Sequence, residues 1–114
     1  MRRRMAEVRP EERRAVRGGE GRALLEAYLR PGEMAGVEFL SRVTLDPRAS
    51  IGEHPHPGEE ELYLILDGRG EGILDGDPFD VAPGDAFLCR KGHSHGLRNT
   101  GEGPLSFLAL LVKA

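Results

Sequence analysis

The chain has 114 residues, 39% of them hydrophobic and 31% charged, with a formal net charge of −3 at pH 7. This length supports one domain around a single core, and the composition excludes a disordered chain. No apolar run approaches the roughly 20 residues of a membrane helix, so no membrane partner is expected. The single cysteine, Cys89, permits no internal disulfide. Nothing therefore argues for secretion, and a cytoplasmic protein is expected.

Residues 1–20 are polar and charged, and they are predicted to form a flexible N-terminal segment ahead of one domain at 21–114. A helical turn is expected within residues 10–16, with a proline at its first position. The arginine run at 2–4 has two interpretations, a nucleic-acid-binding arm or a solvated, frayed terminus. The interleaved glutamates and the acidic net charge favour the second, so no nucleic-acid partner is expected. No apolar stretch follows the arginines, which argues against a signal peptide.

Nine short segments after residue 20 are expected to be β-strands. The first, 22–29, fits a helix or a strand by periodicity, but its strand-like surroundings favour an edge strand. Turns rich in Gly, Pro and Asp separate the others, and Asp67-Gly68 is expected to close a hairpin. The remaining strands are 37–45, 50–56, 61–66, 70–74, 79–81, 86–89, a strand that begins at 95, and 105–112. Many short strands with little helix predict an antiparallel sandwich or barrel.

The histidines indicate where the chemistry lies. On an extended strand, His54 and His56 point to the same face, about 7 Å apart along the chain. The Pro57-Gly58 turn is expected to place Glu61 on an adjacent antiparallel strand, beside the two imidazoles. Two imidazoles and one carboxylate are a recurring ligand set for divalent transition metals.

Two motifs in this half of the chain resemble those of the cupin superfamily. The first reads His54-x-His56, four residues, Glu61, six residues and Gly68. The second reads Gly84, five residues, Arg90-x-Gly92, two residues, His95, three residues and Asn99. The family pattern has Gly at the position of Arg48 and Pro at the position of Arg90, and both departures fall in turns. The resemblance implies an all-β double-stranded β-helix (jelly-roll) cupin barrel, with His54, His56, Glu61 and His95 as metal ligands.

Three imidazoles and a carboxylate suit a divalent transition metal, and the sequence does not choose among Fe, Mn, Ni, Cu and Zn. Glu59 and Glu60 compete with Glu61 as the carboxylate ligand, but only Glu61 has the motif's spacing to Gly68. The alternative is a barrel that binds no metal, since some cupin relatives have lost ligands and serve as scaffolds. All four ligand positions are filled here, which favours metal binding.

The resemblance implies a metal-dependent enzyme of the dioxygenase, decarboxylase or isomerase type that acts on a small anionic molecule, with dioxygenase chemistry as the first choice. Tyr63 and His93 are the candidate catalytic residues for proton transfer. His93 is interpreted as a residue at the rim of the barrel or one that supports the metal ligands from behind. The alternative is that His93 is itself a fifth metal ligand. Arg42 and Arg98 are candidates to pair with a substrate carboxylate. The alternative function is a small-molecule binding or sensing module without turnover.

Several further roles are predicted. A homodimer is expected, because the edge strand 22–29 would benefit from being covered. Cys89 is interpreted as a small core residue rather than a reactive thiolate, and Asn99 as a hydrogen-bonding residue that fixes a strand end. Substrate preference is assigned to rim residues, which are Phe39, Phe79, Phe87, Leu97 and Phe107.

Overall fold

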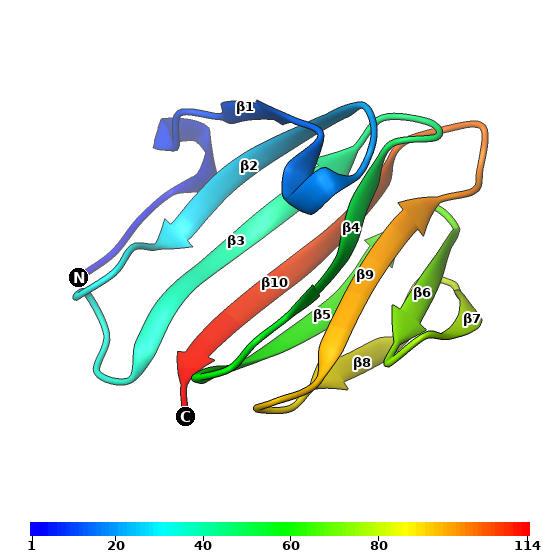
Figure 1. The fold of residues 1–114 in the computed structure, drawn as a ribbon. Helices are drawn as coiled ribbons and strands as arrows, with labels where there is room; N and C mark the ends of the chain where they lie inside the picture. The colour runs from blue at the N-terminus through cyan, green and yellow to red at the C-terminus, as the bar shows by residue number, and fades with distance from the viewer.

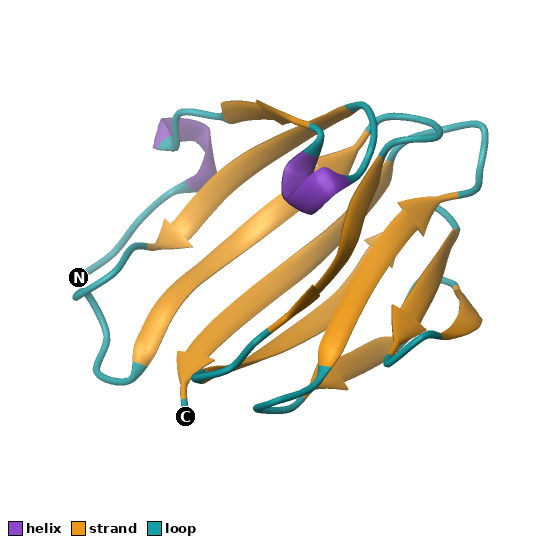
Figure 2. Ribbon diagram, in the orientation of Figure 1, coloured by secondary structure: helices purple, strands orange, loops and turns teal.

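Two antiparallel sheets face each other in the protein, whose structure is a computed structural model that describes residues 1–114 (Figures 1 and 2). The predicted jelly roll, a double-stranded β-helix, is confirmed. The elements are η1 (Met5–Glu7), β1 (Glu11–Arg14), η2 (Val16–Gly18), β2 (Arg22–Leu29), β3 (Val37–Leu45), β4 (Ser50–Pro55), β5 (Glu59–Asp67), β6 (Gly70–Leu74), β7 (Asp77–Val81), β8 (Ala86–Cys89), β9 (Ser94–Asn99) and β10 (Leu105–Lys113).

One sheet has six strands in the order β1-β2-β3-β10-β5-β8, and the other has four in the order β4-β9-β6-β7. Apolar side chains at alternate positions of the facing strands meet between the sheets and form one core, as period-two strands require. The largest side chains with almost no exposure include Leu45, Ile65, Leu97, Leu105 and Phe107. None of the helices has the length and apolar character that crossing a membrane requires.

The N-terminal segment differs most from expectation. Residues 11–14, where a helical turn was predicted, form β1, and η2 follows directly. β1 pairs antiparallel with β2, so Glu11 lies opposite Leu25 and Arg14 opposite Arg22. The segment 22–29 is therefore a strand, as predicted, but it is not at the edge of its sheet. The flexibility expected of residues 1–20 stays a prediction.

The expected hairpin at Asp67-Gly68 is wrong. β5 pairs with β8 and β10, whereas β6 pairs with β7 and β9, so the chain crosses from one sheet to the other here. Gly68 has a φ of +90°, and a Cβ on it would lie 2.5 Å from the Pro104 carbonyl oxygen. The crossing therefore requires glycine both for its backbone conformation and for its close approach.

Asn99 fixes the end of β9, as predicted. Its buried amide donates to the carbonyl oxygens of Leu45 (3.0 Å), Asp46 (3.1 Å) and Gly103 (2.9 Å), and its Oδ1 accepts from Gly101 N–H (3.0 Å). The side chain thus joins the ends of β3 and β9 to the turn that leads into β10.

We expect Asn99→Ala to lower the free energy of unfolding by about 2–3 kcal/mol, because buried carbonyls would lose their only side-chain donor. Urea unfolding measures the change, with Thr100→Ala, at an exposed neighbouring position, as the control. A loss below about 0.5 kcal/mol in Asn99→Ala, which is typical of surface substitutions, would contradict this role.

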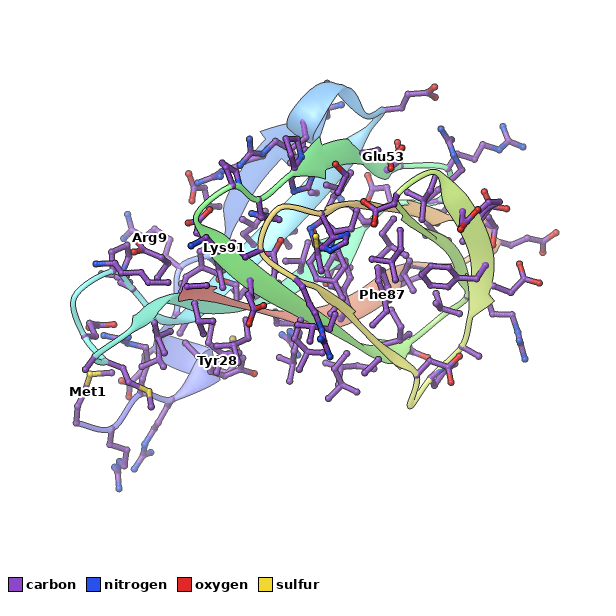
Figure 3. All side chains as sticks on the ribbon, turned by 60° about the horizontal axis from the view of Figure 1, so that its bottom comes forward. Met1, Arg9, Tyr28, Glu53, Phe87 and Lys91 are labelled. Carbon is purple, nitrogen blue, oxygen red and sulfur yellow. The ribbon has the colours of Figure 1, made fainter.

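The predicted rim is mostly core. Phe87, Leu97 and Phe107 are buried between the sheets, and Phe87 lies inside the ring of strands in Figure 3. Phe39 is partly buried and, with Phe107, lines the main cavity. Cys89 is buried, as predicted, and burial raises the pKa of its thiol to about 11, which keeps it protonated at neutral pH.

Candidate metal centre

The four predicted ligands converge from both sheets. His54 on β4 lies opposite His95 on β9, and His56 follows directly after β4, all on the side of the four-stranded sheet. Glu61 comes from β5 of the facing sheet, so the expectation that it lies on a strand adjacent to β4 is wrong. All four side chains are buried, and one potential ligand atom from each lies within 4.8 Å of the others.

A β-bulge aims His54 into the barrel. Ile51 pairs with Leu97 and His54 with His95, so β4 carries one residue more than β9 over this interval. In a regular strand Ile51 and His54 would face opposite sides, whereas the extra residue lets both face inward. Gly96 lies opposite the bulge, and a Cβ on it would be 2.9 Å from the Ile51 carbonyl oxygen. The bulge and this glycine together place the first histidine of the motif.

The ligand atoms form a compact group. His56 Nε2 lies 3.1 Å from both Glu61 Oε1 and His95 Nε2, and His95 Nε2 lies 2.9 Å from Glu61 Oε1. The three imidazoles of His54, His56 and His95 have pairwise centroid distances of 4.8–4.9 Å and interplanar angles of 64–74°. The three rings are thus arranged nearly symmetrically around a common point.

These distances fit a common ion. Ligand atoms about 2.1 Å from a metal lie about 3.0 Å apart at adjacent octahedral positions, and about 3.4 Å apart in a tetrahedron. The 2.9–3.1 Å triangle formed by His56, Glu61 and His95 matches the octahedral edge. The donor set, imidazole nitrogens with one carboxylate, is also that of divalent transition metals. The residues present therefore fit the predicted cofactor, although they do not select its identity.

Hydrogen bonds orient two of the imidazoles. His54 Nδ1–H donates to the Gly52 carbonyl oxygen (2.7 Å), which leaves Nε2 free to bind a metal. His56 Nδ1 faces Glu59 Oε1 at 3.3 Å, so Glu59 is a hydrogen-bond partner behind a ligand rather than a competitor of Glu61. His95 Nδ1 is buried without a partner, and its ring is held by stacking on Tyr63 at a centroid distance of 4.5 Å. Burial also lowers the pKa of His54 and favours the neutral imidazole that binds metals.

Tyr63 lies two residues after Glu61 on the same inward face of β5, and its ring stacks on the imidazole of His95. Burial raises the pKa of its hydroxyl well above the usual value, and the adjacent Glu61 carboxylate acts in the same direction. Tyr63 therefore remains protonated at neutral pH, and in this state it is a hydrogen-bond donor.

A cavity of about 530 Å³ leads from the ligand group toward the N-terminal segment. Its walls include His54, His56, Glu61 and Tyr63 at one end, and apolar residues such as Leu25 and Phe107 along the sheet. Arginines are the other lining group, namely Arg9, Arg13, Arg17 and Arg30. A mainly apolar pocket with a few polar groups is typical of a small-molecule site, and these arginines favour an anion.

The cavity arginines are the functional candidates that sequence reasoning missed. Arg9, Arg13 and Arg17 lie in the segment assigned to a flexible terminus, where no apolar periodicity in the sequence predicts a strand, and Arg30 lies in the turn after β2. The predicted candidates, Arg42 and Arg98, lie on outward faces instead. Arg42 pairs with Glu26 at 2.9 Å, and Arg98 donates to the Arg48 carbonyl oxygen at 3.4 Å.

His93 is not brought to the ligand group. Its exposed ring lies in the turn before β9, where Nδ1 bonds to an Asp75 carboxylate oxygen at 2.5 Å, and it does not line the cavity. Among the four histidines, three are therefore gathered at one point and the fourth links two surface turns.

The family model described as "Cupin domain" matches residues 41–111, more than half of the chain. The chain is a cupin. The oxalate-binding protein of Thermotoga maritima is 34% identical over 110 residues, covering 96% of this cupin and 91% of that protein. The crystal structure of a predicted oxalate decarboxylase from Thermotoga maritima has 34% identity, a TM-score of 0.96 and full coverage of both chains.

A solved structure of lower sequence identity shares the fold. The polyketide cyclase RemF of Streptomyces resistomycificus matches this cupin with a TM-score of 0.75 and 21% identity, over 99% of this chain and 78% of that one. The cupin barrel thus carries more than one activity among its relatives, and fold alone does not define the reaction.

Proposed function

We propose that this cupin is a metal-dependent enzyme that binds a small carboxylate, with oxalate as the first ligand to test. The proposal rests on one observation above all, the convergence of His54, His56, Glu61 and His95 at the end of a cavity that arginines line. The oxalate-binding protein of Thermotoga maritima supports the choice of ligand.

The four ligands would hold a divalent transition ion, which when bound supplies a Lewis acid for a substrate oxygen. The chain itself contributes an apolar wall, with Phe107 among its residues, and a protonated hydroxyl at Tyr63. In decarboxylation of oxalate, the C–C bond breaks, one carbon leaves as CO2, and the other takes up a proton to give formate. Tyr63 is the cavity residue that we assign as the donor of that proton. His93 lies outside the cavity, so we assign it no part in this step.

Oxalate turnover tests the proposal. Protein loaded with Mn(II), and separately with Fe(II), is incubated with oxalate, and formate and oxygen uptake are measured. Formate without oxygen consumption supports the decarboxylase type. Oxygen uptake with release of CO2 and hydrogen peroxide would instead indicate oxidation of oxalate, an oxygen-dependent reaction that is not the dioxygenase type predicted from the sequence. Failure of every loaded form to bind oxalate in calorimetry would contradict the substrate class.

Binding or sensing without turnover is the second candidate. One observation favours it, since Glu11, Ser41 and Tyr63 are the only side chains of the cavity that can exchange a proton, apart from its metal ligands and arginines. Saturable binding of oxalate by the metal-loaded protein, with no formate and no oxygen uptake over many hours, would support this function over catalysis.

We also propose that two copies pair through the outer face of the six-stranded sheet. Leu40, Leu110, Leu62 and Leu88 lie opposite one another on successive strands and form an apolar row across that face. The row ends on β8, the edge strand, where Leu88 is 41% exposed. A two-fold axis would bring two identical rows together and bury them.

Leu88→Glu is expected to convert this dimer into a monomer, because it would place a charge in each half of the buried face. Light scattering during size-exclusion chromatography at micromolar concentration gives the mass. Met34→Glu is the matched control, since Met34 is also exposed but lies in the β2–β3 turn. A monomeric wild-type protein would contradict the dimer.

A further inference from the structure

A short strap, defined here as residues 15–21, crosses from β1 to β2 and lies against the bulge of β4 (Figure 1). Ser50 N–H donates to the Glu20 carbonyl oxygen (2.8 Å), and Glu20 N–H donates to Ser50 Oγ (2.9 Å). Gly52 lies so close that a Cβ on it would be 2.2 Å from the Arg17 carbonyl oxygen. The strap is thus hydrogen-bonded to Ser50, just before the bulge, and packed against Gly52 within it.

The strap holds Arg17 in an uncommon backbone conformation. Arg17 has a φ of +54° and Ala15 a φ of +51°, although two glycines follow at 18 and 19. Left-handed backbone at a residue with a side chain costs free energy, and such residues gather at functional sites where the fold overrides the cost. A glycine at position 17 would meet the backbone requirement without strain, so the arginine side chain needs another explanation.

The Arg17 side chain lines the cavity together with His54 and Tyr63. It has no ion pair with a carboxylate of the chain, whereas Arg13 in the same cavity pairs with Glu11 at 3.3 Å. The Arg17 carbonyl oxygen lies against Gly52, two residues before His54 in β4. Arg17 is therefore a cavity arginine without a carboxylate partner, and its backbone packs against the strand that carries a metal ligand.

We infer that Arg17 is a substrate-recognition residue, which pairs with a second carboxylate of a ligand whose first carboxylate is held at the metal centre. The inference rests on the proposed function and narrows its ligand class, because a guanidinium in the same cavity as the metal ligands selects dicarboxylates over monocarboxylates. Arginine suits this role, since its planar fork donates two parallel hydrogen bonds to one carboxylate. The strap is the part of the fold that places this fork.

Calorimetric titration of the Mn(II)-loaded full-length protein with oxalate and with acetate tests the inference. Arg17→Gln is expected to weaken oxalate binding by about 10- to 100-fold, the usual effect of losing a charge-assisted pair. Acetate, which has no second carboxylate, is expected to change less than about threefold. Manganese affinity is expected to stay unchanged, and Arg69→Gln, an exposed arginine outside the cavity, should behave as wild type.

Arg17→Gly separates recognition from folding. It removes the side chain but relieves the left-handed strain, so its melting temperature is expected to equal or exceed that of the wild type while oxalate binding is lost. Equal oxalate affinity in Arg17→Gln and wild type would overturn the inference and leave the metal-dependent function intact. Equal losses for oxalate and acetate would also overturn it, because they indicate a structural role. A wild-type protein that binds no oxalate would overturn the proposed function itself.

Discussion

His56→Ala is expected to lower the affinity for Mn(II) or Zn(II) by more than about 100-fold. Loss of partners behind the ligands already costs about 10- to 100-fold, and His56 Nε2 contacts two other ligand atoms at 3.1 Å. Competition with a chromophoric chelator measures the affinity. Metal at 100 times the dissociation constant should stabilise the wild-type fold by about 2.7 kcal/mol and so raise its melting temperature. His56→Ala should show no such rise at the same metal concentration.

His93→Ala is the matched control for this experiment. It removes the same type of side chain, two residues from the ligand His95, but His93 is exposed and bonds to Asp75 rather than to the ligand group. Wild-type metal affinity is expected in this variant. Loss of metal binding in His93→Ala, or its retention in His56→Ala, would contradict the assignment of the centre.

Gly52→Ala is expected to detach the strap at residues 15–21 from β4. The backbone of Gly52 has no positive φ, so alanine is forbidden only by contact, with its Cβ 2.2 Å from the Arg17 carbonyl oxygen and 3.0 Å from Gly19 N. Both neighbouring atoms belong to backbone, which cannot rotate away as a flexible side chain can. We expect a loss of about 1–3 kcal/mol in the free energy of unfolding, as in other overpacked sites.

Hydrogen exchange locates the effect of Gly52→Ala within the fold. The amides of Ser50 and Ala15 donate to the Glu20 and Gly21 carbonyl oxygens, and both are expected to exchange faster. The amides of β10 should keep the same ranking of exchange rates among themselves as in the wild type. Gly58→Ala is the control, because Gly58 also has no positive φ and an added Cβ would meet nothing within 4 Å. An unchanged exchange rate at Ser50 in Gly52→Ala would show that the strap tolerates the added methyl group.

Part of the centre could be predicted from local geometry, since strand periodicity places His54 and His56 on one face. The resemblance to the two cupin motifs implied Glu61 and His95 as the other ligands. The strand at 37–45 was predicted from the same period of two. The two histidines and this strand depend on residues a few positions apart, whose relation a strand fixes.

The tertiary structure alone decided the rest. Glu61 reaches the histidines across the barrel, not from an adjacent strand, because β5 and β4 belong to different sheets. Arg17 reaches the cavity because Gly52, 35 positions later in the chain, leaves room for its backbone. Neither contact has a local pattern in the sequence. The sequence by itself therefore determined which side chains form the candidate metal centre, whereas packing between distant segments determined which arginines line the cavity beside it, because close backbone contact is a property of the assembled fold.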